Sequence, residues 1–225
     1  MKIHATELVI FGATDFARVA RRLAEATRNY VVRAFVVDRG WQDVSDLDGL
    51  PVVDGSDLLT RFPPTQFSMF VASGYKSMRG REYLYSRWKA QGYCLENIHG
   101  SGSNVAPDVE LGDNNIFFPG VVIEPGAKVG NNNVVWSNST ICHDSKFGDH
   151  NFVAAGTTIG GNVLVGSLCF FGFGCVVLNG LTLGNEVLIG AQSLVTQNAD
   201  NLWELRGTPA RPLRRVESEV GIRVG

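Results

Sequence analysis

His143 and Asp144 are adjacent in the sequence, and such a pair can accept and hold a proton. A histidine titrates near neutral pH, and a neighbouring carboxylate can orient its ring and stabilise its charged form. The pair falls within a repeat described below, in which the equivalent residues of other repeats are proline, glycine, asparagine and glutamine. We therefore take His143 as a candidate general base and Asp144 as its partner, although an inert surface pair has the same spacing.

The other metal-ligating residue types are too scattered to predict a metal site. The carbonic anhydrases of left-handed β-helix type hold zinc with three histidines, two of them five residues apart, whereas His143 and His150 are seven apart. The remaining histidines, His4 and His99, lie far upstream. Four cysteines have no paired or metal-type spacing, and we expect free thiols in a reducing compartment. These are Cys94, Cys142, Cys169 and Cys175.

The overall charge and hydropathy indicate neither a nucleic-acid partner nor a membrane span. The formal net charge is −2, and no apolar run approaches the ~20 residues that cross a bilayer. The first residues have no signal-peptide pattern, so we expect a cytoplasmic protein. Arginines nevertheless gather after the repeat, where they are surface charges or contacts for a phosphate: Arg206, Arg211, Arg214, Arg215 and Arg223.

A repeat of six residues runs from Val105 to Asp200 and must position the His143–Asp144 pair. Each of its sixteen hexads opens with Val, Ile, Leu or Phe. A strand alternates with period two, so a period of six contains a short strand and a turn. Three hexads close a triangular coil, and stacked coils pair parallel strands eighteen residues apart. At one corner every coil has glycine, which predicts that the backbone conformation there, or the close approach of the neighbouring coil, leaves no room for a Cβ. These residues, which we call the glycine column, are Gly112, Gly130, Gly148, Gly166 and Gly184.

The first 100 residues predict an α/β domain of Rossmann-like type. Apolar runs ending at Gly or Asp predict strands over residues 7–12, 30–37, 65–74 and 93–98, and helical spacing predicts helices over 15–28 and 78–92. The turn GATDFA can present backbone N–H groups to an anion, or serve as a structural turn only. It has no dinucleotide fingerprint, which argues against NAD. Asp38 ends the second strand, within reach of a ribose or base.

The segments IEPGAKVGNNN, ICHDSKFGDHNF, FFGFGCV and LIGAQSLV, with VIFGA near the start and GTPAR near the end, carry a family resemblance. The chain resembles the hexapeptide-repeat nucleotide-sugar acetyltransferases of the PglD/NeuD type. The resemblance implies an all-β left-handed parallel β-helix over residues 101–200, behind the Rossmann-like domain of 1–100 and before a capping tail of 201–225. It also implies a homotrimer, with acetyl-CoA in the groove between neighbouring prisms and a nucleotide-linked amino sugar on the first domain.

Matched positions assign roles to residues by resemblance. His143 takes the place of the catalytic base and Asp144 that of its acidic neighbour. The implied nucleotide-sugar contacts are Thr14, Asp15, Phe16, Asp38, Arg39 and Gly74, and the implied acetyl-CoA contacts are Phe173 and Ala191. Phe152 stands where some members have a second histidine, so backbone N–H groups or His150 would have to stabilise the oxyanion.

We therefore expect an acetyl-CoA-dependent N-acetyltransferase that uses no metal. Its expected acceptor is a nucleotide-linked 4-amino-4,6-dideoxyhexose used in surface-polysaccharide or glycan biosynthesis. One alternative is O-acetylation of a sialic-acid-type or other sugar hydroxyl. A second alternative is a non-catalytic β-helix that binds a nucleotide sugar as a scaffold. The sequence leaves open the nucleotide, the sugar epimer and the role of His150.

Overall fold

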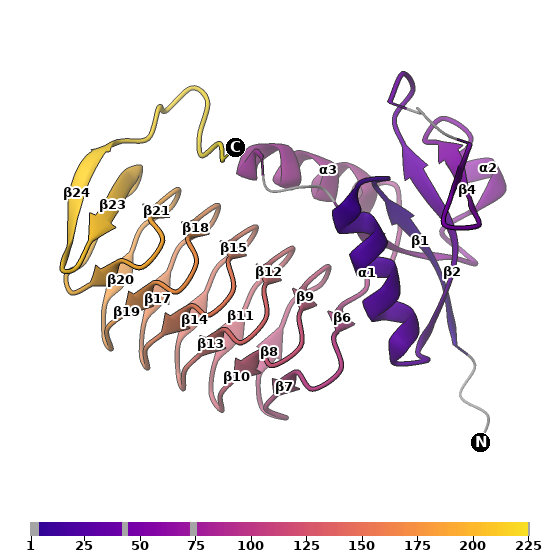
Figure 1. Ribbon diagram of the computed structural model, residues 1–225. Coiled ribbons are helices and arrows are strands. Elements are labelled where there is room, and N and C mark those ends of the chain that lie inside the picture. The colour runs from indigo at the N-terminus through magenta and orange to yellow at the C-terminus, as the bar shows by residue number, and fades with distance from the viewer. Residues whose placement is uncertain (1–4, 42–44, 73–75, 225) are drawn as a thin grey trace.

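The computed structural model describes residues 5–41, 45–72 and 76–224 (Figure 1). Its first part is a five-stranded sheet in the order β3-β4-β2-β1-β5, in which all pairs are parallel except the β3–β4 hairpin. Three of its strands form where apolar runs predicted them, over residues 7–12, 30–37 and 65–74, whereas the β3–β4 hairpin was not predicted. The strands are β1 (Thr6–Phe11), β2 (Tyr30–Val37), β3 (Asp46–Leu47), β4 (Leu50–Asp54) and β5 (Ser68–Val71).

Helices connect these strands and join the sheet to the rest of the chain. Helix α1 (Asp15–Ala26) links β1 to β2, and α2 (Leu58–Arg61) is a single turn. Helix α3 (Met78–Ala90) begins at Ser77, whose hydroxyl accepts a hydrogen bond from the Gly80 N–H at 3.1 Å. The strand expected over residues 93–98 is not formed as such: Leu95 makes one parallel bridge to Met69, and Ile98 already belongs to the repeat.

The hexads form a parallel β-solenoid of two-residue strands in three columns, as the period of six predicted. Paired residues are eighteen apart, as Val122, Thr140 and Thr158 are. The hexad-opening residues point inward, and all but Val105 and Leu111 are buried. The glycine column has no other residue because the backbones of successive coils approach closely there: a Cβ on Gly148 would lie 2.6 Å from the carbonyl oxygen of Gly166.

We name the three faces by what lies on them. The helix face consists of β6 (Ile98–His99), β9 (Ile116–Phe117), β12 (Val134–Val135), β15 (Phe152–Val153), β18 (Phe170–Phe171) and β21 (Leu188–Ile189). The Val–Thr face consists of β7 (Asn104–Val105), β10 (Val122–Ile123), β13 (Thr140–Ile141), β16 (Thr158–Ile159), β19 (Val176–Val177) and β22 (Leu194–Val195). The lysine face consists of β8 (Glu110–Leu111), β11 (Lys128–Val129), β14 (Lys146–Phe147), β17 (Leu164–Val165) and β20 (Thr182–Leu183).

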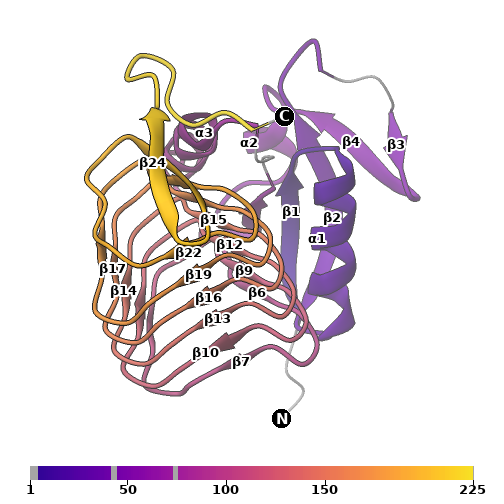
Figure 2. The ribbon, with the colours of Figure 1, turned by 60° about the vertical axis from the view of Figure 1, so that its left-hand side comes forward.

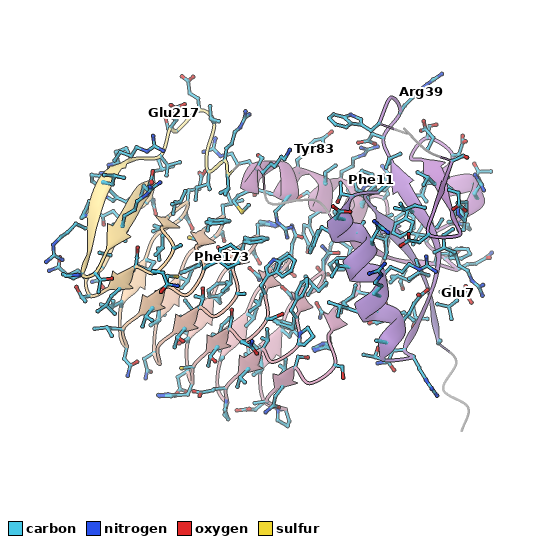
Figure 3. All side chains as sticks on the ribbon, viewed as in Figure 1. Glu7, Phe11, Arg39, Tyr83, Phe173 and Glu217 are labelled. Atoms are coloured by element: carbon cyan, nitrogen blue, oxygen red, sulfur yellow. The ribbon has the colours of Figure 1, made fainter. Side chains whose placement is uncertain are left out.

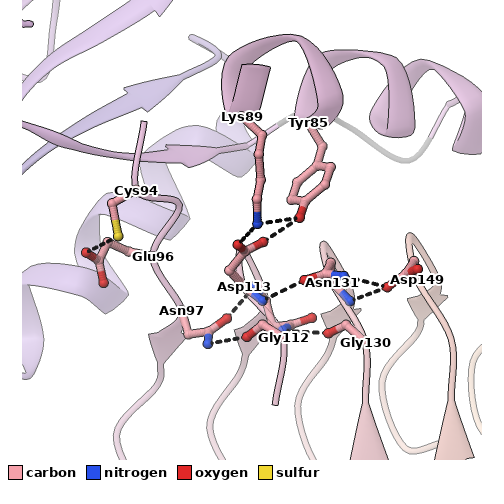
Figure 4. A network of polar contacts seen from close by, with 11 residues as sticks. Tyr85, Lys89, Cys94, Glu96, Asn97, Gly112, Asp113, Gly130, Asn131 and Asp149 are labelled. Carbon is pink, nitrogen blue, oxygen red and sulfur yellow. Dashed lines mark hydrogen bonds and ion pairs between the residues drawn. The ribbon is translucent and has the colours of Figure 1, made fainter. Parts of the chain in front are cut away.

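The α/β domain packs on the helix face: α3 runs above it, and α1 stands beside its first strand, β6 (Figures 1 and 2). The outward residues of this face, such as Val134 and Phe152, are therefore buried. Helix α3 is fixed to the solenoid by Tyr85 and Lys89, which both contact Asp113, and the Tyr85 hydroxyl donates to its carboxylate at 2.6 Å (Figure 4). The other two faces carry no part of the α/β domain in the views of Figures 1 and 2.

The solenoid ends in the antiparallel hairpin of β23 (Trp203–Gly207) and β24 (Ala210–Arg215). Strand β23 pairs in parallel with β21, so the hairpin extends the helix face by two strands. A paired edge protects the open end of a repeat array. The chain then returns to α3, which the sequence analysis did not predict. Among the described residues no helix is long and apolar enough to cross a membrane, and the cytoplasmic location stays a prediction.

Candidate functional site

His143 lies in the turn after β13, at the corner between the Val–Thr face and the lysine face, which we call the His143 corner. Its Nδ1 lies 3.0 Å from Oδ2 of Asp144, and about half of each side chain is exposed. Its Nε2 lies over Gly161 of the next coil, where a Cβ would approach within 2.5 Å. When Nδ1–H donates to Asp144, Nε2 is left with a lone pair that can accept a proton from a bound molecule.

Backbone contacts from neighbouring coils hold this corner in place. The His143 N–H donates to Oε2 of Glu124 at 2.8 Å, and its carbonyl oxygen accepts from Asn162 at 2.9 Å. Asp144 has a φ of 58°, a left-handed conformation that Asp and Asn tolerate better than most residues. Sequence reasoning missed Glu124, because its partner is nineteen residues away and the contact depends on the stacking of coils.

Phe173 and Ala191, the expected acetyl-CoA contacts, lie at a different corner. They follow β18 and β21 in the turns between the helix face and the Val–Thr face, which we call the Phe173 corner. Phe173 projects from the solenoid and is 63% exposed (Figure 3). The whole Val–Thr face separates this corner from His143, so a single chain does not bring these residues together.

A cleft of about 500 Å³ opens at the carboxyl ends of β1 and β2, where Thr14 and Asp38 line it. Gly12 also lines the cleft. Its φ is 121°, and a Cβ at this position would lie 2.8 Å from the carbonyl oxygen of Ala72. Thr14 caps α1 without a side-chain hydrogen bond to the helix. Crevices at the carboxyl ends of parallel strands are where open α/β sheets bind ligands.

The side chain of Asp38 is oriented by α3. One carboxylate oxygen accepts from Arg87 at 2.7 Å, and the guanidinium of Arg87 lies 4.6 Å from the ring centroid of Trp88. Helix α3 also supplies Gly80, Tyr83 and Leu84 to the cleft, and Trp41 completes its rim. The aromatic lining is exposed, with Trp41 at 79% and Tyr83 at 65%. Sequence reasoning missed these residues, because it did not predict that α3 borders the cleft.

Three of the other expected nucleotide-sugar contacts, Asp15, Phe16 and Arg39, are not in the lining of this cleft. Asp15 is almost fully exposed and faces Arg18. The ring of Phe16 packs toward Trp136 of the solenoid, with centroids 6.1 Å apart. Arg39 is exposed. Gly74 lies outside the described residues.

His150 is a buried structural residue in this chain. It lies at the third corner, between the lysine face and the helix face, where its ring packs edge-on against Tyr85 at 5.2 Å. The amide nitrogen of Asn132 donates to its Nδ1 at 2.9 Å. Burial lowers the pKa of His150 to about 4, while Asp149 opposes and Arg81 reinforces this shift. His150 therefore stays neutral and lies away from the His143 corner.

Phe152 and the remaining histidines also lie away from the His143 corner. Phe152 is on the helix face, stacked on Phe170 with centroids 5.3 Å apart. His99 packs against Phe117, and burial lowers the pKa of His99. His4 lies outside the described residues. Across residues 5–41, 45–72 and 76–224, no group of three or more His, Cys, Asp or Glu could hold a metal.

The arginines after the repeat are only partly available for a ligand. Arg206 and Arg214 both pair with the buried carboxylate of Glu204. The guanidinium of Arg215 lies 4.0 Å from the ring centroid of Trp203. The side chain of Arg211 is exposed and donates only to the carbonyl oxygen of Ala210, at 3.1 Å.

This chain has an α/β domain followed by a parallel β-solenoid, with a histidine–carboxylate pair at one corner of the solenoid. This architecture defines the class of proteins with which the chain is compared. Its sequence matches no family model and no curated protein. Solved structures do match, and they confirm the parallel β-solenoid expected from the resemblance.

Three matched structures cover nearly all of the chain. PerB from Caulobacter crescentus, solved with CoA and GDP-perosamine, has a TM-score of 0.84 and 25% identity over 95% of this chain and 100% of its own. The acetyltransferase domain of PglB from Neisseria gonorrhoeae, solved with acetyl coenzyme A, has a TM-score of 0.84 and 24% identity over 93% and 100%. WeeI from Acinetobacter baumannii has a TM-score of 0.82 and 22% identity over 93% and 100%.

Proposed function

We propose that this chain is an acetyl-CoA-dependent N-acetyltransferase that acts on a nucleotide-linked amino sugar. The observation that carries the proposal is the His143 corner, where Asp144 accepts from Nδ1 and Nε2 is left as a base. The likeness to PerB, solved with CoA and GDP-perosamine, supports both ligands. The proposed acceptor is a 4-amino-4,6-dideoxyhexose, made for a surface polysaccharide or another glycan.

The proposed reaction is a direct attack of the sugar amine on the thioester carbonyl of acetyl-CoA. As the C–N bond forms, Nε2 of His143 takes the proton of the amine. A backbone N–H stabilises the oxyanion, since the side chain of Phe152 has no polar hydrogen and His150 is buried at another corner. The C–S bond then breaks, and the departing thiolate recovers the proton from His143 to give CoA and the N-acetyl sugar.

The nucleotide sugar is proposed to bind the cleft of the α/β domain. The strand order β4-β2-β1-β5 is that of a Rossmann-like sheet, and the cleft lies at the carboxyl ends of β1 and β2. Thr14 and Asp38 line it directly. The proposed roles of Asp15, Phe16 and Arg39 need a ligand that extends beyond this lining, and the proposed role of Gly74 falls outside the described residues.

A homotrimer would complete the site, because His143 and the Phe173 corner lie on opposite edges of the Val–Thr face. The outward residues of that face are mostly uncharged and small or β-branched, which suits close packing between copies: Asn104, Val122, Thr140, Thr158, Val176 and Leu194. We propose left-handed coils, with acetyl-CoA lying along Phe173 and Ala191 of one chain toward His143 of its neighbour. We propose exposed Arg211 as the arginine that contacts a CoA phosphate.

Acetyl transfer to matched acceptors tests this function. Purified protein is incubated with acetyl-CoA and either a 4-amino sugar or its 4-hydroxy counterpart on GDP, UDP or dTDP, and thiol release is followed. Release that requires the amine supports N-acetylation. Release only with the hydroxy sugar supports O-acetylation instead, and failure to bind CoA in calorimetry supports a non-catalytic scaffold.

A further inference from the structure

The last described segment, residues 216–224, runs from the far end of the solenoid back to α3, and we call it the strap (Figures 1 and 2). It leaves the hairpin where the Val216 N–H donates to the carbonyl oxygen of Leu202 at 2.8 Å. It then makes a tight turn, in which the Gly221 N–H donates to the carbonyl oxygen of Glu217 at 2.8 Å. The strap therefore connects two parts of the molecule that the repeat itself does not join.

The strap pairs with the backbone at the start of α3. The Met78 N–H donates to the carbonyl oxygen of Ile222 at 3.2 Å, and Arg223 forms an antiparallel bridge with Ser77. The Val224 N–H donates to the carbonyl oxygen of Lys76 at 3.3 Å. The side chain of Ile222 is only 1% exposed, so apolar burial anchors the same joint.

An ion pair beneath the strap joins α3 to the solenoid. Arg79, in the first turn of α3, contacts both carboxylate oxygens of Glu186, at 3.0 and 2.7 Å. Gly221 lies directly over this pair: a Cβ there would approach Glu186 within 2.5 Å and Arg79 within 2.7 Å. Its φ of 68° also favours glycine. The strap thus needs glycine at this position to close over a bidentate ion pair.

The rest of α3 is held without the strap. Arg81 is fully buried and donates to the carbonyl oxygen of Asn132 at 2.8 Å, while Tyr85 and Lys89 contact Asp113. These contacts begin at Arg81, the fourth residue of the helix. The two residues that open the helix, Met78 and Arg79, contact the strap and Glu186 instead.

We propose that the strap positions one wall of the nucleotide-sugar cleft. Gly80, Tyr83 and Leu84 of α3 line that cleft, and the strap fixes the turn from which this wall begins. The role rests on the proposed function of the cleft. It is a positioning role, because no strap residue lines the cleft. The strap thereby makes acceptor affinity depend on a segment that lies far from the cleft residues in sequence.

The variant Gly221→Val tests the strap within the full chain, with Glu219→Ala, an exposed strap residue, as the matched control. In steady-state assays with GDP-perosamine and its UDP- and dTDP-linked counterparts, we expect Gly221→Val to raise KM for the acceptor about fivefold or more. KM for acetyl-CoA and kcat should stay within about twofold. An unchanged acceptor KM, or a fall in kcat alone, would overturn the proposal.

Amide hydrogen exchange separates this proposal from the proposed function, because it needs no substrate. In Gly221→Val the amides of residues 78–81 should exchange at least about tenfold faster, while those of the solenoid strands are unchanged. Glu186→Gln, which keeps the shape of the side chain, should give a smaller change of the same kind if Gly221→Val does not fold. Exchange at wild-type rates in both variants would refute the strap even in an active enzyme.

Discussion

At the scale of single residues, Asp144 supplies both a charge and a hydrogen-bond acceptor, and the two can be separated. Asp144→Asn keeps a residue that tolerates its φ of 58° and an oxygen that can accept from Nδ1 of His143. It removes the charge that stabilises the imidazolium. We expect acetyl-transfer kcat to fall about tenfold, measured by thiol release. Asp108→Asn, two coils away in the same column, is the control; equal kcat in both variants would contradict a role for the charge.

His150 gives a prediction about stability rather than activity. Burial lowers its pKa to about 4, so between that value and the ordinary 6.5 the unfolded chain binds the proton more readily than the folded chain. The free energy of unfolding should therefore fall as the pH drops through this window, by on the order of 2 kcal/mol, with no effect above it.

The substitution His150→Asn should remove this part of the pH dependence. Asparagine already occupies the equivalent position two coils and one coil earlier, at Asn114 and Asn132, with φ values of 55° and 54°. Urea unfolding at pH 7 and pH 5, at one protein concentration, measures the difference. An unchanged slope of stability against pH in the variant would show that other groups cause it.

His143 and Asp144 could be selected from the sequence because they are adjacent, and adjacent residues lie close together in any fold. The sequence could not identify Glu124, whose contact arises only when one coil stacks on the next. Nor could it assign His150, because the burial of that ring depends on where α3 packs. Residues that act through neighbours distant in sequence become visible only with tertiary structure.

At the scale of elements, the glycine column makes the coils stack closely. Gly148→Ala would place a Cβ 2.6 Å from the carbonyl oxygen of Gly166, and backbone on both sides limits relaxation. We expect a loss of about 2 kcal/mol or more in the free energy of unfolding, measured by urea denaturation. Gly190→Ala is the control, since its Cβ would approach the flexible side chain of Arg206 within 2.9 Å but the backbone only at 3.5 Å, an ordinary contact with the Leu205 oxygen. Equal losses in both variants would mean that coil spacing does not set this column.

The period of six predicted the solenoid strands well, because every hexad places Val, Ile, Leu or Phe at the same inward-facing position. The α/β elements were less regular. The β3–β4 hairpin (Asp46–Leu47 and Leu50–Asp54) carries no long apolar run and was not predicted. The strand expected over 93–98 was wrong in extent, since Leu95 and Ile98 pair with different sheets.

For the whole molecule, the proposed reaction requires two neighbouring chains to form one site, with the His143 corner from one chain and the Phe173 corner from the other. His143→Ala and Phe173→Glu should each be inactive alone, the second because a carboxylate would repel the phosphates of CoA. Mixed homotrimers of the two should recover about a quarter of wild-type activity, because random assembly joins an intact His143 corner to an intact Phe173 corner in that fraction of sites. Activity no greater than that of the unmixed variants would place the whole site within one chain.

The central claim is that His143 is the base of an acetyl transfer to a sugar amine. The most direct measurement compares kcat of wild type and His143→Ala with acetyl-CoA and GDP-perosamine, or whichever UDP- or dTDP-linked 4-amino sugar the wild type acetylates. Light scattering confirms in parallel that both have the same oligomeric mass. We expect kcat of His143→Ala to be about a hundredfold or more below that of the wild type, with unchanged assembly. A variant that acetylates the amine within about twofold of the wild-type rate would contradict the central claim.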